Sequence, residues 1–423
     1  MRSAWYVLGA LTVICAFNMI DRYLLAGLVG PIKHEFGVSD TYIGFLLGPS
    51  FAILYTTVAI PIARLADRSS RVRIISLGCA VWSLFTILSG LANDSTTFAL
   101  LRLGVGLGEA AFVAPAYSLL ADYFPPRRRA LAFAIMGTGY FIGQFAGLTA
   151  GAGIAEVYGW RAAFIAMGVP GIVLAAIFFV TAREPARLQS PLALKTAQAP
   201  LWVAVRQLVA RPSYRLLTIG SSFGSFATYA FAMWGPTYFM RVYEMSMSRA
   251  NFYFAVFYGF SCMIGTLTCG WLSDRAARRG VAAPMRVAAA ALFSLVVCLI
   301  LVALLPQVGV AVTVMAIGGV AGGGYSAAVV ASMHDLVPQG IRATATAIWS
   351  FVFNFVGFVW GPYAVGVLSD AFSDRGPDAL RIALVCTSSL GLLGAFLLLR
   401  SSYTLAEDET RLAMASPNEA PSF

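Results

Sequence analysis

The chain has 423 residues, of which 59% are hydrophobic and only 11% are charged, and its mean hydropathy is +0.79. An average soluble protein carries about 25% charged residues, so this chain has too few polar side chains to cover water-exposed domains. The net charge of +10 arises from short basic clusters between apolar stretches, which indicate membrane topology rather than a nucleic-acid-binding surface.

Apolar stretches long enough to cross a bilayer recur along the whole chain. Between charge and turn clusters they predict twelve transmembrane helices, at about 4–30, 40–63, 74–92, 97–123, 130–153, 160–182, 214–240, 250–273, 285–305, 308–333, 343–366 and 380–400. The predicted fold class is an all-α membrane protein. The first stretch is too long and too polar for a cleaved signal peptide, so we expect it to remain in the mature protein.

The basic residues predict the orientation of these helices. If successive loops lie on alternate sides, 21 of the 29 basic residues fall on the side of the termini, six fall on the other side, and Arg22 and Arg102 lie inside spans. By the positive-inside rule both termini are predicted to be cytoplasmic, with the plasma (inner) membrane as the expected location.

The longest connection, 183–213, separates two groups of six predicted helices, 1–182 and 214–400. Its proline-rich part is expected to be a linker, and Leu201 to Ala210 is predicted to form a short amphipathic helix at the cytoplasmic interface. Residues 401–423 form a polar cytoplasmic tail, for which no regular structure is expected.

Two loop motifs repeat between the halves. Ala63 to Arg71, after span 2, matches Gly270 to Arg278, after span 8, at an offset of 207, and Asp122 to Ala130 matches Asp335 to Ala343 at an offset of 213. An Asp at a helix end can pair with Arg residues and face a neighbouring helix N-terminus, as a contact that forms or breaks when the halves move. The predicted gating residues are Asp67, Arg68, Arg71, Asp122, Arg129, Asp274, Arg275 and Arg278.

With twelve spans, a 6+6 repeat, a long central loop and these two loops, the chain resembles the major facilitator superfamily over essentially its full length. Ala63 and Ser70 stand where that family usually has Gly in the first loop. The resemblance implies two bundles that rock about a central site near the bilayer midplane.

Two further motifs resemble the spinster branch, whose members move lysophospholipids and sphingosine 1-phosphate. They are Asp21-Arg22-Tyr23 in span 1, and Arg102 followed by Gly-rich sequence to Glu109-Ala110 in span 4. The resemblance implies Asp21 as a proton site and Arg102 as a head-group contact, with Arg22, Tyr23 and Glu109 in the same polar cluster.

Asp21, Arg22, Arg102 and Glu109 are the charged residues predicted to lie well inside spans. At about 2.5–3.5 kcal/mol for each charge at a helix centre, four isolated charges would cost roughly 10–14 kcal/mol, so they must be paired or hydrated. An anionic ligand that draws an Arg away makes the neighbouring carboxylate easier to protonate, which can couple proton and substrate. A static salt bridge between helices is the alternative interpretation.

Spans 7, 8, 10 and 11 offer aromatic and polar side chains without charge at mid-depth, and a charged wall facing an apolar one suits an amphipathic ligand. The candidate contacts among them are Tyr229, Trp234, Tyr325 and Asn354. Each of these could equally be an ordinary packing residue.

Glycine patterns predict close packing and helix breaks. Gly139, Gly143, Gly147 and Gly151 recur every fourth residue in span 5, which favours close contact with another helix. Breaks or kinks are predicted at Gly235-Pro236, at Gly361-Pro362 and at the glycine cluster 318–324.

The sequence thus predicts a proton-coupled secondary transporter of a lysophospholipid or related amphipathic anionic or zwitterionic lipid. Asp21 is the first choice for the proton carrier and Glu109 the second. The alternatives are a proton-linked carrier of small organic anions such as sugar acids, and an uncoupled lipid facilitator or scramblase. Without a nucleotide loop, nucleophile elbow or metal constellation, no enzymatic activity, cofactor or metal is expected, and a monomer is predicted.

Overall fold

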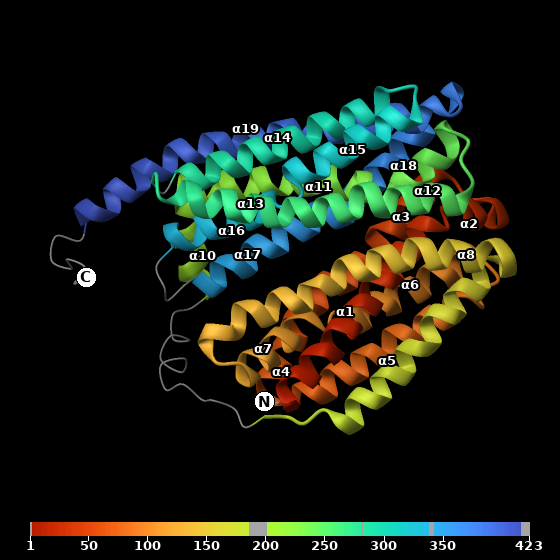
Figure 1. Ribbon diagram of the computed structural model, residues 1–423, viewed down its shortest axis with the longest axis horizontal. Helices are drawn as coiled ribbons and strands as arrows, with labels where there is room; N and C mark the ends of the chain where they lie inside the picture. The colour runs from red at the N-terminus through yellow and green to blue at the C-terminus, as the bar shows by residue number, and fades with distance from the viewer. Residues whose placement is uncertain (1, 186–200, 281, 338–341, 416–423) are drawn as a thin grey trace. The chain divides into compact units, whose positions relative to one another are not determined.

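The computed structural model describes residues 2–185, 201–280, 282–337 and 342–415, and in this part every regular element is a helix (Figure 1). The α-helices are α1 (Arg2–Gly27), α2 (Val29–Phe36), α3 (Asp40–Leu47), α4 (Pro49–Arg68), α5 (Arg71–Ser89), α6 (Ser95–Glu109), α7 (Val113–Tyr123), α8 (Pro126–Thr181), α10 (Leu201–Ala210), α11 (Pro212–Val242), α12 (Met247–Phe254), α13 (Ser261–Ala277), α14 (Ala283–Leu304), α15 (Val308–Gly322), α16 (Tyr325–Leu336), α17 (Arg342–Asn354), α18 (Gly361–Ala371) and α19 (Asp378–Ala415). Two π turns, η1 (Ala255–Phe260) and η3 (Phe355–Trp360), and a short 3-10 helix, η4 (Ser373–Arg375), complete the list.

Eleven helical segments of the described chain are long and apolar enough to cross a membrane. One of them, Arg127–Thr181, contains two of the predicted spans and appears in Figure 1 as two arms of α8 that meet at a bend. The arms are separated at Gly159, whose φ of 84° and ψ of 160° are nearly exclusive to glycine. The all-α fold with about twelve spans is therefore confirmed.

The apolar surface fits this assignment. Large hydrophobic side chains are widely exposed, among them Leu77, Val180 and Leu267. A water-soluble monomer rarely exposes apolar surface on this scale, whereas lipid acyl chains cover it without cost.

Several spans are broken at glycine. Span 2 is divided between α3 and α4 at Gly48, and span 10 between α15 and α16 at Gly323 and Gly324. Span 11 changes from π turn to α-helix at Gly361 while remaining helical from Thr344 to Ala371, so the predicted break or kink at Gly361-Pro362 stays a prediction. A break at Gly235-Pro236 is not observed, because α11 runs unbroken past Pro236. A membrane helix tolerates a proline where its neighbours satisfy the freed backbone groups.

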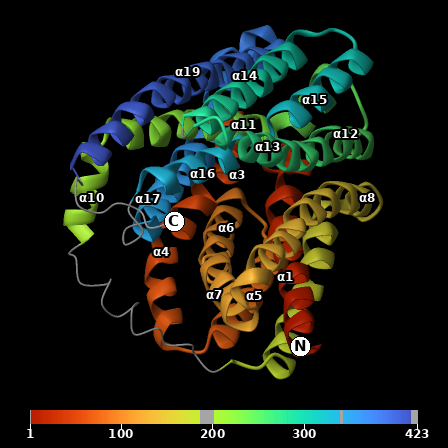
Figure 2. The same ribbon diagram turned by 60° about the vertical axis from the view of Figure 1, so that its left-hand side comes forward.

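The glycine face of span 5 packs on α1, which lies along α8 in both views (Figures 1 and 2). A Cβ at Gly139, Gly143 or Gly147 would lie 2.6, 2.1 or 2.8 Å from the carbonyl oxygens of Thr12, Ala16 and Ile20, respectively, and at Gly151 it would meet the Leu24 side chain at 2.4 Å. The four contacts follow one face of α1 at intervals of one helical turn. They fix the helix that carries Asp21 and Arg22.

The chain forms two compact units. Unit 1 comprises 1–189, 230–259 and 358–383, and unit 2 comprises 190–229, 260–357 and 384–423. Unit 1 thus contains the first six spans together with the end of α11, all of α12 and α18, and the start of α19. The division of the chain into repeated halves, 1–182 and 214–400, is a different grouping and stays a prediction.

Two predictions on the connections can be compared with the helix bounds. Leu201–Ala210 forms α10, as expected, while residues 186–200 of the predicted linker lie outside the described part. The expectation of an irregular tail after Arg400 is wrong as far as Ala415, because α19 continues to that residue. Residues 401–415 include several Ala, Leu and Glu residues, which are strong helix formers.

Candidate functional site

A cluster of four buried charged residues lies inside unit 1, and we call Asp21, Arg22, Arg102 and Glu109 the central cluster. The first two belong to α1 and the other two to α6. The glycines of α6 allow its close approach to α4 and α5: a Cβ at Gly106 would lie 2.3 Å from the Phe51 carbonyl oxygen, and one at Gly108 would lie 2.5 Å from the Trp82 backbone nitrogen. The sequence prediction that these four side chains gather is therefore met in the structure.

Arg22 and Glu109 form the paired half of the cluster. The Arg22 Nε donates a hydrogen bond to Glu109 Oε2 at 2.7 Å, and Arg22 Nη2 lies 2.7 Å from the same oxygen. The guanidinium carbon also lies 4.7, 4.6 and 5.3 Å from the ring centroids of Phe51, Tyr55 and Phe358, respectively. Since Glu109 and three aromatic faces stabilise the Arg22 charge, this arginine is well compensated.

The positive charge of Arg102 is compensated much less than that of Arg22. Its side chain is 2% exposed, and its Nη2 donates a long hydrogen bond of 3.5 Å to the backbone carbonyl oxygen of Asp21. Its Nε and Nη1 are buried without any hydrogen-bond partner. No carboxylate oxygen in the described chain lies within 4.0 Å of the Arg102 guanidinium nitrogens. A buried donor without a partner costs about 1–3 kcal/mol, and more when it is charged. Arg102 is therefore a site of unsatisfied positive charge.

Asp21 is adjacent to this arginine but is not paired with it through its carboxylate. Its side chain is buried, and it lies beside Thr86 of α5. Arg102, Arg22 and Glu109 are all close enough to influence its charge. A carboxylate in this position responds to any change in its arginine neighbours.

The remaining predicted binding residues are divided between the two units. Tyr23 follows Arg22 on α1 and is half-buried. Trp234 is fully buried in unit 1, where its Nε1 donates a hydrogen bond of 2.9 Å to the Pro362 carbonyl oxygen, and its predicted contact with substrate stays a prediction.

Tyr229, Tyr325 and Asn354 belong to unit 2. The Tyr325 hydroxyl donates to the Ser221 carbonyl oxygen at 3.3 Å, and Asn354 Nδ2 donates to the Ser350 carbonyl oxygen at 2.8 Å. Their predicted contact with substrate stays a prediction.

Sequence reasoning missed a second charged centre in unit 1, the Asp40 cluster of Lys33, Asp40, Arg241, Ser369 and Asp370. Asp40 accepts bonds from Lys33 Nζ at 2.5 Å, from Arg241 Nη1 and Nη2 at 2.5 and 2.7 Å, and from Ser369 Oγ at 2.7 Å. The Asp370 carboxylate accepts from the backbone N–H groups of Asp40 and Thr41 at 3.0 and 2.7 Å. Since α3, α11 and α18 each contribute, this cluster joins segments that lie about 200 and 330 residues apart in sequence.

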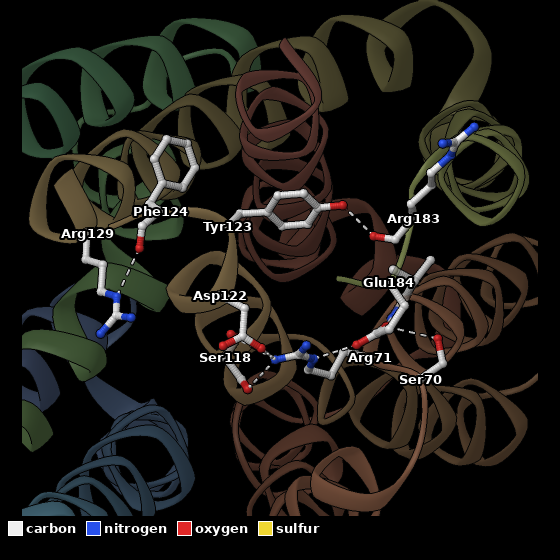
Figure 3. Close-up of polar contacts among 10 residues, drawn as sticks. Ser70, Arg71, Ser118, Asp122, Tyr123, Phe124, Arg129, Arg183 and Glu184 are labelled. Atoms are coloured by element: carbon white, nitrogen blue, oxygen red, sulfur yellow. Dashed lines mark hydrogen bonds and ion pairs between the residues drawn. The ribbon is translucent and has the colours of Figure 1, made fainter. Parts of the chain in front are cut away.

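The first predicted gating loop is also built around one arginine (Figure 3). Arg71 Nη1 donates to Asp122 Oδ2 at 2.6 Å and to Ser118, and Arg71 Nε donates to Glu184 Oε1 at 2.7 Å. We call Ser70, Arg71, Ser118, Asp122 and Glu184 the Arg71 cluster. The predicted residues Arg71 and Asp122 are brought together, while Glu184, just after the last span of the first half, was missed.

Glu184 is held as a carboxylate. Burial alone raises its pKa, but hydrogen bonds from the Val72 N–H, the Arg71 guanidinium and the Ser70 hydroxyl outweigh burial, so that the pKa lies below its ordinary value of 4.5. Arg129 donates to the Phe124 carbonyl oxygen at 3.1 Å, Arg68 is exposed, and the side chain of Asp67 lies outside the described residues.

The second gating loop differs from the first. Asp274, Arg275 and Arg278 are exposed, and no ion pair joins them to one another or to other described side chains. The Arg275 guanidinium instead lies 5.6 Å from the Trp271 ring centroid. The side chains of Asp335 and Arg342, which the repeat aligns with Asp122 and Arg129, lie outside the described residues. The gating roles of both loops stay predictions.

Membrane-spanning helices around buried, incompletely paired charges define a polytopic transporter architecture. The model of the Major Facilitator Superfamily matches residues 11–362, and the chain belongs to this family.

The relatives of the chain include transporters of several kinds. An MFS-type efflux pump of Mycolicibacterium smegmatis is 31% identical over 93% of this chain and 91% of its own length. Protein spinster homolog 1 of Xenopus tropicalis is 28% identical, over 96% and 81%. A probable L-galactonate transporter of Escherichia coli is 26% identical, over 90% and 86%. A solved bacterial homologue of the human lysosomal transporter spinster, inward-facing and unoccupied, has a TM-score of 0.85 at 27% identity, covering 96% of this chain and 98% of that one.

Proposed function

We propose that the protein is a proton-coupled secondary transporter that moves a lysophospholipid or related amphipathic anionic or zwitterionic lipid by alternating access. Its resemblance to spinster proteins supports the lipid class, and its family supports transport. Both termini are cytoplasmic, the plasma (inner) membrane is the location, and the protein acts as a monomer.

The observation that carries this proposal is the unsatisfied guanidinium of Arg102. Two buried N–H-bearing nitrogens without acceptors can bind a phosphate or carboxylate oxygen. Arg22 already has Glu109, so Arg102 is the available anion-binding group in the central cluster. A bound anion compensates the free-energy cost of burying the Arg102 charge, which a static contact between helices leaves uncompensated.

Proton coupling follows from the neighbouring carboxylate. Arg102 contacts the backbone of Asp21, and an anion that draws the guanidinium toward itself leaves the Asp21 side chain with less positive charge nearby. Asp21 then takes up a proton when the anion binds. Glu109 is the second candidate, and its ion pair with Arg22 must break before it can serve. One proton crossing 100 mV supplies about 2.3 kcal/mol.

The competing substrate class is a small organic anion such as a sugar acid, supported by the similar protein named as a probable L-galactonate transporter. Arg102 would serve both classes equally, so the chemistry of the charged group does not separate them. The absence of charged residues at mid-depth in spans 7, 8, 10 and 11 favours a ligand with an acyl chain. An uncoupled facilitator or scramblase would need no response to a pH gradient.

Binding measurements on purified protein test the substrate. Lysophosphatidylglycerol, lysophosphatidylcholine and galactonate are compared for wild type, Arg102→Ala and Arg64→Ala, the last being an exposed arginine outside the cluster. Two charge-assisted hydrogen bonds at about 1.5 kcal/mol each correspond to an affinity loss of roughly 100-fold in Arg102→Ala. Undiminished lysolipid affinity in that variant refutes the head-group role, and galactonate binding without lysolipid binding selects the alternative.

Flux in proteoliposomes tests the coupling. A pH gradient is expected to drive accumulation by wild-type protein, while Asp21→Asn retains binding and loses the response to the gradient. If Glu109→Gln loses that response and Asp21→Asn keeps it, the proton carrier is Glu109. Flux that is equal with and without the gradient in wild-type protein identifies an uncoupled facilitator.

A further inference from the structure

A basic cavity lies in unit 1 between the first turns of α1 and the connection from α7 to α8. Its volume is about 620 Å³, and its lining includes Trp5, Phe124, Arg127 and Arg128. The Trp5 and Phe124 rings are in edge-to-face contact, with 5.4 Å between their centroids. Both arginines are exposed, and no ion pair joins either one to an acid in the part of the chain that the structure describes.

An apolar groove continues from this cavity along α1. It has a volume of about 390 Å³, shares Trp5 with the cavity, and is walled by Val13 and by Leu174, Ile177 and Phe178 of the second arm of α8. Its floor includes Gly9, where an added Cβ would meet nothing within 4 Å. The lining residues of α1 span Trp5 to Val13, or about 12 Å along the helix axis.

The cavity and the groove together match the two parts of a lipid, a charged head group and an acyl chain. An exposed pair of arginines beside an aromatic ring suits a negatively charged head group at the bilayer interface, and a groove of aliphatic side chains suits an acyl chain. Arg102, the proposed substrate contact, does not line either hollow.

We propose that this cavity and groove bind one anionic phospholipid of the surrounding bilayer, with its phosphate at Arg127 and Arg128 and an acyl chain between α1 and α8. The lipid bridges the start of α1 to the end of α7, where the Tyr123 hydroxyl donates to the Arg183 carbonyl oxygen beside the Arg71 cluster (Figure 3). It therefore stabilises this end of the first six spans and is not transported.

Charge selectivity is the first test. Delipidated full-length protein is titrated with phosphatidylglycerol or phosphatidylcholine, and retention is read by native mass spectrometry and by thermal shift. The expected preference for phosphatidylglycerol is about 30-fold, which corresponds to about 1 kcal/mol for each arginine. Equal retention of the two lipids overturns the proposal.

Three variants locate the site. Arg127→Gln with Arg128→Gln is expected to abolish the preference, while Arg64→Gln with Arg73→Gln, an equal charge change at exposed positions outside the lining, keeps it. Gly9→Phe fills the groove at constant charge and is expected to weaken phosphatidylglycerol retention at least fivefold. Equal loss in the two double variants overturns the cavity assignment, and unchanged retention in Gly9→Phe overturns the groove.

A last variant separates this lipid from a substrate. Arg102→Ala is expected to keep the full preference for phosphatidylglycerol. A loss of the preference in this variant would show that the lipid binds at the central cluster and overturn the proposal.

Discussion

Arg241 holds α11 to α3 through Asp40, and its replacement by glutamine is expected to raise the equilibrium constant for opening of this contact about 30-fold. The substitution removes two charge-assisted hydrogen bonds, of 2.5 and 2.7 Å, to a carboxylate that is only 5% exposed. Lys33 and Ser369 still donate to Asp40, so the carboxylate is not left without partners.

The size of the expected effect follows from how deeply Asp40 and Arg241 are buried. Hydrogen bonds to charged groups contribute about 1.5–3 kcal/mol each. Arg241 is 27% exposed, so water compensates part of the loss, and we expect about 2 kcal/mol for the pair. At 1.4 kcal/mol for each factor of ten, this corresponds to about 30-fold in an opening equilibrium.

Hydrogen exchange reports the opening of the Asp40 cluster through the backbone amides of α3. The backbone N–H groups of Asp40 and Thr41 donate to the Asp370 carboxylate, and they exchange only when α3 separates from α18. Because position 241 is far from these amides in sequence, the substitution leaves their intrinsic exchange rates unchanged. The amides of Asp40 and Thr41 are therefore expected to exchange about 30-fold faster in Arg241→Gln.

Arg381→Gln is the matched control. Arg381 lies 3.3 Å from Asp378, which is 61% exposed, and a surface pair of this kind contributes about 0–1 kcal/mol. It is expected to leave exchange in residues 39–47 unchanged. Exchange in Arg241→Gln within threefold of wild type, or an equal increase in both variants, would refute the assigned role of Asp40.

Three further substitutions test the fold and the Arg71 cluster. Because the pKa of Glu184 lies below 4.5 in the folded protein, its ionised form contributes stability at neutral pH that is lost as the pH falls through the folded pKa. Glu184→Gln should therefore lower the melting temperature at pH 7 and flatten the decrease of the melting temperature below pH 5. An unchanged pH profile would contradict the hydrogen bonding described. Gly143→Leu should abolish the folded protein in detergent, since even a Cβ would lie 2.1 Å from the Ala16 carbonyl oxygen, whereas Gly153→Leu, with nothing within 4 Å of its Cβ, should fold normally in size-exclusion chromatography. Gly159→Ala has open space around its Cβ but a φ of 84°, so it should cost about 1–3 kcal/mol through backbone strain alone; an unchanged melting temperature would refute that reason.

The central cluster could be predicted because its cause is local to each span. A charge inside an apolar helix is expensive wherever the helix packs, so Asp21, Arg22, Arg102 and Glu109 had to meet or be hydrated. Which arginine receives a carboxylate is a different matter. It depends on how closely α6 approaches α4 at Gly106 and on three aromatic rings around Arg22, including one from residue 358. No sequence pattern in spans 1 and 4 contains that information.

The Asp40 cluster could not be predicted for a related reason. Lys33, Asp40, Arg241 and Asp370 stand near the ends of different spans, where isolated charges ordinarily face water or lipid head groups. Only the packing of α3 against α18 makes Asp40 buried, and that packing depends on Gly44 and Gly366, where a Cβ would lie 2.7 and 2.2 Å from the carbonyl oxygens of Pro362 and Asp40. Single glycines in a glycine-rich membrane protein do not identify their partners.

The way the chain passes between its two units connects these observations. Two of the crossings from one unit to the other, Gly259 to Phe260 and Gly357 to Phe358, lie within the π turns η1 and η3. A π turn interrupts regular α-helical hydrogen bonding, so it is a place where a helix can change direction at low cost. Phe358 of η3 also lies on the Arg22 guanidinium. Arg22 therefore contacts both Glu109 of the central cluster and one of these turns, so the central charges and a π turn share one side chain.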